Sequence, residues 1–223
     1  MTHWLVLPSP FLGASAYAPL VDALRGGGDD ASVATYPEPP VAADLVTAWS
    51  ATAGRIDDVV LVPHSNAGHL APLVSGRCGG LPIVFMDAAL PAPSGTSPLV
   101  PPGLRSHLAD LTDPDGRLAR WSRWWPRDDL DDVLPGEWFE RIDAAAPRVP
   151  LAYADDAVEV PDGWEGRRCA YLAFGETYAE ELARVRELGW PHRIVAGRHL
   201  QCVVDPDATA TGLRALLEEL RGC

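Results

Sequence analysis

A serine between small residues is the first group in this sequence that could carry out chemistry. The segment PHSNAG (residues 63–68) follows an apolar run, residues 58–62, and precedes a stretch with helical spacing. A small-x-Ser-x-small turn between a strand and a helix is a nucleophile elbow, in which a strained backbone exposes the serine hydroxyl. We therefore predict that Ser65 is a nucleophile. The structural alternative is a serine that caps the N-terminus of the helix.

A histidine near the other end of the chain is the candidate base. His199 lies one short loop after the apolar run 192–196 and just before the last helical stretch. The order serine then histidine, with the histidine after the last strand, is typical of Ser-His catalytic sites. The other histidines are predicted to be structural. Among them His64 is next to the serine and is expected to point away from it.

Two backbone amides are candidates for holding a negatively charged oxygen beside the serine. The loop LPSPFLG (residues 7–13) follows the first predicted strand, and Pro10 has no N–H to donate. We therefore expect Phe11 to supply one amide. The amide of Asn66, directly after the nucleophile, is expected to supply the other.

These segments resemble the α/β-hydrolase superfamily over nearly the whole chain, in particular small bacterial members that are rich in proline and tryptophan. The resemblance rests on LVPHSNAG (residues 61–68), VAGRHL (residues 195–200) and the loop 7–13, which lacks the usual His-Gly. It implies acyl transfer by a Ser-His-acid triad, with an acyl-enzyme that water hydrolyses. We therefore expect a serine hydrolase that cleaves a small-molecule ester or thioester and needs no cofactor and no metal.

The resemblance implies two places for the acid of the triad. One follows the apolar run 169–174, where the superfamily often has Gly-x-x-Asp, but here GETY (residues 175–178) ends in a tyrosine and its Glu176 is shifted. The other follows the run 82–86 and offers Asp87. We predict Asp87 as the acid and Glu176 as the alternate. Asp155, Asp156 or a dyad without a carboxylate are further alternatives.

Short apolar runs and helical patterns alternate along most of the chain and must position these groups. The predicted strands are 4–7, 32–36, 58–62, 82–86, 169–174 and 192–196, and the predicted helices are 17–25, 41–53, 66–74, 178–188 and 207–221. This alternation predicts an α/β fold with a mostly parallel sheet flanked by helices and a ligand site at the carboxyl ends of the strands. We predict a core of residues 1–89 and 169–223, with a cap of residues 90–168 inserted between two core strands.

Aromatic residues of the predicted cap are candidates for a substrate pocket. Trp124 and Trp125 are expected to lie above Ser65, together with Trp121, Trp138 and Phe139. An apolar pocket with few polar groups is typical of small-molecule sites. Alternatively, these large rings form a small core of the cap itself.

The composition limits the partners of this protein. It has 18 basic and 31 acidic residues among 223, a net charge of −13, which disfavours nucleic acids and anionic membranes. The four cysteines have no CxxC or metal-ligand spacing. No run is long and apolar enough to span a bilayer, and the N-terminal residues do not have the pattern of a signal peptide. We expect a cytoplasmic protein whose partner is a small-molecule substrate, and the oligomeric state stays open.

Two other classes of function remain compatible with these residues. A lyase, a cyclase or a carbon–carbon hydrolase of a biosynthetic pathway would use the same Ser-His machinery for proton transfer or bond cleavage. A catalytically silent ligand-binding protein is the class without enzyme activity. The unusual acid position and the missing His-Gly favour that second class, whereas the presence of both Ser65 and His199 argues against it.

Overall fold

Six parallel strands form the central sheet of residues 2–222, the residues that this computed structural model describes. Their order is β2-β1-β3-β4-β7-β8, and every neighbouring pair is parallel. The bounds are β1 (His3–Leu7), β2 (Asp30–Val33), β3 (Val59–Ser65), β4 (Ile83–Ala88), β7 (Cys169–Phe174) and β8 (His192–Val195). The prediction of a mostly parallel sheet is confirmed. Strands β3, β4 and β7 are buried along their whole length, which explains their continuous apolar sequences.

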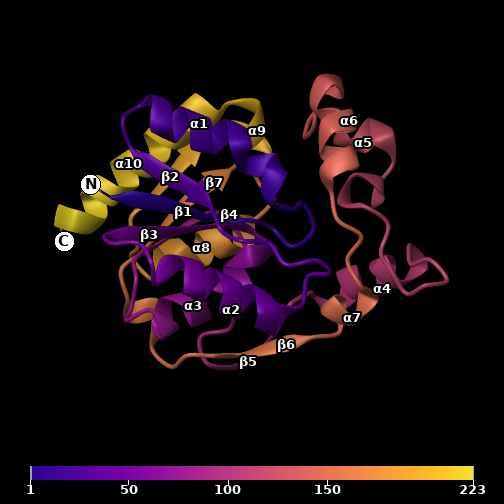
Figure 1. Cartoon of the computed structure of the whole chain (residues 1–223), viewed down its shortest axis with the longest axis horizontal. Helices are drawn as coiled ribbons and strands as arrows, with labels where there is room; N and C mark the ends of the chain where they lie inside the picture. The colour runs from indigo at the N-terminus through magenta and orange to yellow at the C-terminus, as the bar shows by residue number, and fades with distance from the viewer. Residues whose placement is uncertain (1, 223) are drawn as a thin grey trace.

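Helices cover both faces of this sheet (Figure 1). On one face lie α1 (Ala18–Gly26), which follows the 3₁₀ helix η1 (Ala14–Tyr17), and the pair α9 (Gln201–Val204) and α10 (Pro206–Gly222). On the other lie α2 (Ala42–Ala53), α3 (Ala71–Arg77) and α8 (Ala179–Glu187). The apolar positions of each helix recur at helical spacing, so one side of the helix is buried against the sheet. In α10 this buried side includes Leu213, Leu216 and Leu220.

Several predicted elements differ from the observed ones, and strand β3, for example, extends to Ser65 instead of ending at residue 62. Residues 66–74 do not form one helix: the 3₁₀ helix η2 (Asn66–His69) comes first, and α3 begins at Ala71. Pro72 explains the break, because proline is tolerated only in the first turn of an α-helix. Strand β2 begins and ends earlier than predicted, because its pairing with β1 ends at Val33. Strand β4 is longer than predicted and includes Asp87.

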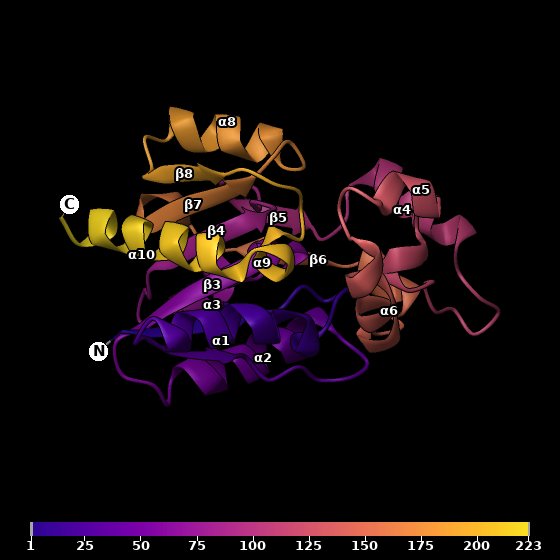
Figure 2. The same ribbon diagram turned by 90° about the horizontal axis from the view of Figure 1, so that it is seen from above.

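The segment between β4 and β7 has two parts (Figures 1 and 2). Its two ends form an antiparallel ribbon of β5 (Gly95–Pro98) and β6 (Ala157–Val160), and η4 (Trp164–Gly166) follows this ribbon. Its middle forms α4 (Pro102–Asp110), η3 (Trp121–Arg123), α5 (Arg127–Leu130), α6 (Gly136–Ala145) and α7 (Leu151–Ala154). These helices lie beyond the carboxyl ends of the strands, where ligands of parallel sheets bind. We call this helical part, residues 102–154, the cap helices.

A buried carboxylate joins two of the cap helices. Asp143 on α6 accepts hydrogen bonds from the guanidinium of Arg123 at 2.9 Å and from the hydroxyl of Ser122, both on η3. The hydrogen bond from Arg123 is the main reason why the pKa of Asp143 falls to about 2. The guanidinium groups of Arg123 and Arg127 also lie over the ring of Phe139. The cap helices therefore have a small core of their own.

Candidate active site

The backbone around Ser65 is strained. Ser65 is the last residue of β3 and has φ 57° and ψ −132°, a backbone conformation that residues other than glycine rarely adopt. Its carbonyl accepts a hydrogen bond from Ala89 N–H at 3.1 Å, just after β4. A Cβ on Gly68 would lie 1.9 Å from the carbonyl oxygen of Ala89, so only glycine fits at this position. The turn after β3 is therefore packed directly against the end of β4, which holds the serine in its strained position.

The structure brings Ser65, His199 and Asp87 together in one chain of hydrogen bonds. The distance from His199 Nε2 to Ser65 Oγ is 3.1 Å, and that from His199 Nδ1 to Asp87 Oδ2 is 2.7 Å. The side chains of His199 and Asp87 are 8% and 1% exposed. Phe174 N–H donates to the other carboxylate oxygen, Oδ1, at 2.8 Å. With Nδ1–H donating to Asp87, Nε2 is free to accept the serine proton.

The alternative acids lie elsewhere. Glu176 is exposed, and among residues 2–222 it is not a hydrogen-bond partner of His199. Asp155 is paired with Arg105 at 2.6 Å, and Asp156 is exposed. The structure therefore places Asp87, and none of the alternative carboxylates, at the imidazole.

His64 holds the loop of His199 through a hydrogen bond to the backbone carbonyl of His199. Its Nε2 lies 3.0 Å from the carbonyl oxygen of His199, which can only accept, so Nε2 carries the proton. Its Nδ1 must then accept from the hydroxyl of Tyr17 at 2.8 Å, and that hydroxyl accepts from Ser9 N–H at 2.9 Å. Burial lowers the pKa of His64 well below its ordinary value, which keeps the ring neutral in this role. The network links the loop after β1 to the loop after β8.

The two predicted amides come from loops after neighbouring strands. Asn66 is the first residue of η2, so its N–H has no partner within that helix. Its side chain donates to the carbonyl of Leu99 and accepts from the Tyr153 hydroxyl at 2.7 Å. Phe11 N–H makes a long hydrogen bond of 3.4 Å to Ser9 Oγ, which a stronger acceptor can replace.

A cavity of about 800 Å³ opens between these groups and the cap helices. Ser65 and His199 lie in its wall, and Trp121, Trp124 and Trp125 line it. Trp138 and Phe139 follow the alternative expectation of a cap core: they are not among the lining residues and lie against arginine side chains. Most of the remaining lining groups are apolar, and they include Phe11, Leu90, Leu104, Leu130 and Val133.

Two further residues of this cavity were not predicted from the sequence. The hydroxyl of Tyr178 lies 3.3 Å from Ser65 Oγ, and burial raises its pKa. The only sequence signal was that this tyrosine stands where an aspartate is common. His69 also lines the cavity, and burial lowers its pKa to about 4. The only indication of this in the sequence was that His69 lies in the predicted helix 66–74, which begins directly after Ser65.

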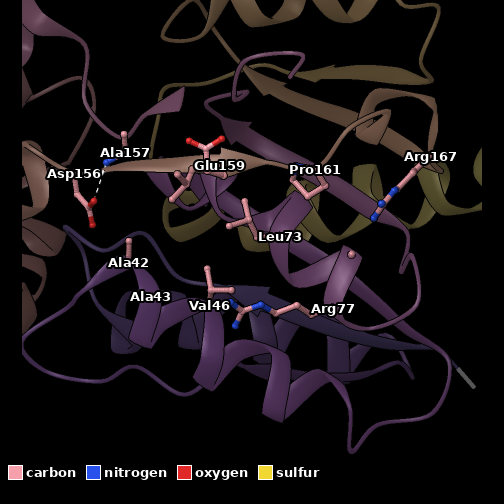
Figure 3. A pocket seen from close by; sticks show the side chains of 12 residues that line it. Ala42, Ala43, Val46, Leu73, Arg77, Asp156, Ala157, Glu159, Pro161 and Arg167 are labelled. Carbon is pink, nitrogen blue, oxygen red and sulfur yellow. Dashed lines mark hydrogen bonds between the residues drawn. The ribbon is translucent and has the colours of Figure 1, made fainter. Parts of the chain in front are cut away.

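Other parts of the molecule offer less chemistry. A second hollow of about 640 Å³ lies between α2, α3 and β6, with Arg77 and Glu159 on opposite walls (Figure 3). Within residues 2–222, no three His, Cys, Asp or Glu side chains gather so that they could hold a metal ion. Cys78, Cys169 and Cys202 are free thiols, whereas Cys223 lies outside the described residues. No helix of the described part is long and apolar enough to cross a membrane.

Comparisons with known proteins agree with this fold. No protein-family model and no curated protein matches the sequence. Solved structures do match, among them an extracellular α/β-hydrolase from a Paenibacillus species, with a TM-score of 0.77 and 16% identity over 97% of this chain and 98% of that one. Polyneuridine aldehyde esterase matches with a TM-score of 0.72 and 15% identity, over 97% of this chain and 98% of that one. The T18A mutant of tomato methylketone synthase I matches with a TM-score of 0.70 and 14% identity, over 98% of both chains.

The chain therefore has the α/β-hydrolase fold. At 14–16% identity this likeness is one of fold. The resemblance seen in the sequence is confirmed at this level.

Proposed function

We propose that this protein is a serine hydrolase that cleaves a small-molecule carboxylic ester or thioester through an acyl-enzyme. One observation carries the proposal: Ser65, His199 and Asp87 form a continuous hydrogen-bonded chain in the wall of a large, mostly apolar cavity. This arrangement is what nucleophilic catalysis by serine requires, because the base must contact the nucleophile and must itself be oriented by a third group.

In the acylation step, His199 Nε2 accepts the proton of Ser65 while Oγ attacks the carbonyl carbon. The amides of Phe11 and Asn66 stabilise the negative charge that develops on the carbonyl oxygen. Asp87 stabilises the imidazolium, and the hydrogen bond from Phe174 N–H keeps the carboxylate in place. The protonated imidazole then gives its proton to the leaving group. Water activated by the same histidine releases the acid.

The shape and charge of the cavity favour neutral, apolar substrates. Aromatic and aliphatic groups form most of its wall, and the carboxylates of Asp129 and Glu181 also line it. Arg184 lines it too, but its guanidinium is bound to Glu165 at 2.7 Å. An anionic substrate would therefore meet acidic groups without a free cation from these residues. The similar folds of an esterase and of a pyrethroid hydrolase support ester cleavage, but the substrates of those two proteins are not carried over to this one.

The test is covalent labelling with a fluorophosphonate probe, read by intact mass. We expect one adduct on the wild type, none on Ser65→Ala, and labelling slowed at least about 100-fold in His199→Ala. Ser97→Ala is a matched control, because Ser97 also lines the cavity but is not hydrogen-bonded to His199. It should keep the adduct. A folded wild type that acquires no adduct, or an adduct that persists in Ser65→Ala, would contradict the proposal and favour a ligand-binding protein.

A further inference from the structure

A tyrosine hydroxyl contacts the proposed nucleophile, Ser65. Tyr178 lies directly before α8, and its ring centroid is 5.5 Å from that of His199. Its hydroxyl oxygen is 3.3 Å from Ser65 Oγ. Tyr178 also lines the cavity, so a substrate bound at Ser65 meets this hydroxyl.

The hydroxyl of Tyr178 acts as a hydrogen-bond donor. Burial raises its pKa from an already high value, so the phenol keeps its proton at neutral pH. The proton of Ser65 is directed to His199 Nε2, which lies 3.1 Å away. Ser65 Oγ therefore offers only a lone pair to Tyr178, and the phenol must donate to it.

The order of the sheet places this donor on the leaving-group side. Phe11 and Asn66 follow β1 and β3, whereas Tyr178 and His199 follow β7 and β8 on the other flank of β3. The carbonyl oxygen of the substrate points to the two amides, and the leaving oxygen must lie near His199, which protonates it. Tyr178 stands beside His199 on that same flank.

We propose that the Tyr178 hydroxyl donates a hydrogen bond to the leaving oxygen, and that the substrates are oxygen esters of aliphatic alcohols. This inference rests on the proposed serine hydrolase. When Oγ bonds to the carbonyl carbon it becomes a poor acceptor, and the leaving oxygen on the same carbon becomes the better partner of the phenol. The C–O bond then breaks, its electron pair stays on the leaving oxygen, and the Nε2 proton of His199 moves there to give the alcohol. Tyr178 keeps its own proton throughout.

The leaving group of a substrate determines how much this donor speeds its acylation step. An aliphatic alkoxide is strongly basic and accumulates charge as the bond breaks, so a second donor lowers its barrier. A nitrophenolate spreads its charge over the ring and leaves without such help. A thiolate sulfur is a weak acceptor. A site with Tyr178 is therefore suited to alkyl oxygen esters rather than to activated esters or thioesters.

The test compares wild type and Tyr178→Phe on ethyl butyrate, p-nitrophenyl butyrate and ethyl thiobutyrate. All three form the same butyryl-enzyme, so differences in kcat/KM report the acylation step. Removal of one donor to a developing charge costs on the order of 10- to 100-fold or more. We expect such a loss for ethyl butyrate, and a loss below about threefold for the other two substrates, whose leaving groups need no donor.

Two controls keep the outcome specific. Labelling of Tyr178→Phe by the fluorophosphonate probe shows that its nucleophile and fold are intact. Tyr171→Phe also removes a buried tyrosine hydroxyl, one that donates to the Ala88 carbonyl outside the cavity lining, and should leave the ratio of ethyl to nitrophenyl activity unchanged. Equal losses on all substrates in Tyr178→Phe, or a labelled wild type that does not cleave ethyl butyrate, would overturn the inference. Absence of labelling on the wild type would instead overturn the proposed function.

Discussion

At the scale of single residues, Asp87, the proposed acid, is held in place by one backbone N–H and one imidazole. Asp87 is completely buried, and its partners are His199 Nδ1 and Phe174 N–H. Its φ of 41° is positive, which is uncommon for residues other than glycine. Strain of this kind persists only where the surrounding structure determines it, and it is frequent at active sites.

Replacement of this aspartate separates the two acids considered from the sequence. We expect Asp87→Asn to lower kcat/KM for an ester by about 10³- to 10⁴-fold, because the imidazole loses its orientation and the partner of its charge. Glu176→Gln is the matched control, and its activity should stay within about twofold of the wild type, as is usual for an exposed side chain away from such features. Steady-state kinetics on both variants decides, and the opposite ranking would assign the role to Glu176.

His69 makes the stability of the fold depend on pH. The unfolded chain binds a proton at this residue near its ordinary pKa of 6.5, whereas burial lowers the folded value to about 4. Its contribution is therefore complete above pH 6.5 and is lost as the pH falls toward 4. Between pH 7.5 and 5 the wild type should lose about 2 kcal/mol more than His69→Gln, which cannot titrate. Urea unfolding at both pH values measures this difference, and equal losses in the two proteins would contradict it.

At the scale of elements, the site depends on the contact between the turn after β3 and the end of β4. Ser65, the last residue of β3, and Asp87, the last but one of β4, both have positive φ, and Ala89 N–H joins the two strand ends. Gly68 lets η2 approach Ala89 closely. Ser65 and Asp87, the proposed nucleophile and acid, are therefore positioned by one packed junction of neighbouring strands.

A methyl group at this junction should disrupt it. We expect Gly68→Ala to lower the free energy of unfolding by about 3 kcal/mol or more, because the new Cβ collides with backbone that cannot move freely. Gly26→Ala adds the same methyl group at the end of α1, where nothing lies within 4 Å. It should change stability by less than about 1 kcal/mol. Thermal and urea unfolding compare the two, and a Gly68→Ala protein as stable as Gly26→Ala would refute the argument.

At the scale of the whole molecule, we expect substrate selection to depend on the cavity between the sheet and the cap helices. Ser65 ends strand β3 and His199 lies in the loop after β8, whereas the segment of the cap helices supplies Trp121, Trp124 and Trp125. Trp138 belongs to the cap as well, but it lies against Arg141 and outside the cavity. This contrast between two tryptophans of the same segment allows a direct test.

Trp125→Ala should weaken binding of large substrates without affecting the chemistry. Loss of part of an aromatic wall costs about 1–2 kcal/mol, so KM for a naphthyl ester should rise about 5- to 30-fold. KM for the corresponding methyl ester should change less than about threefold, since a small substrate makes few contacts with this ring. Trp138→Ala should show no such selectivity. Kinetics on both esters decides, and equal effects of the two variants would contradict a role of Trp125 in the pocket.

The sequence by itself determined the parts of this protein that are local in the chain. Buried parallel strands require continuous apolar runs, so the sheet was readable from the residues, and so was the class of fold. The turn around Ser65 is likewise a local pattern, because one short segment contains the strand end, the serine and Gly68. His199 was readable from its place after the last strand.

Only the tertiary structure decided which distant side chains meet. Asp87 and His199 are separated by 112 positions, and β4 and β7 are neighbours, so an acid after either strand was compatible with the sequence. The choice depended on the direction in which each side chain points, which backbone angles and packing set together. The contact of Tyr178 with Ser65, and the division of the cap tryptophans between cavity and cap core, were decided in the same way. These side-chain directions cannot be predicted from residue types and their spacing, because the directions are set only when separate elements pack against one another.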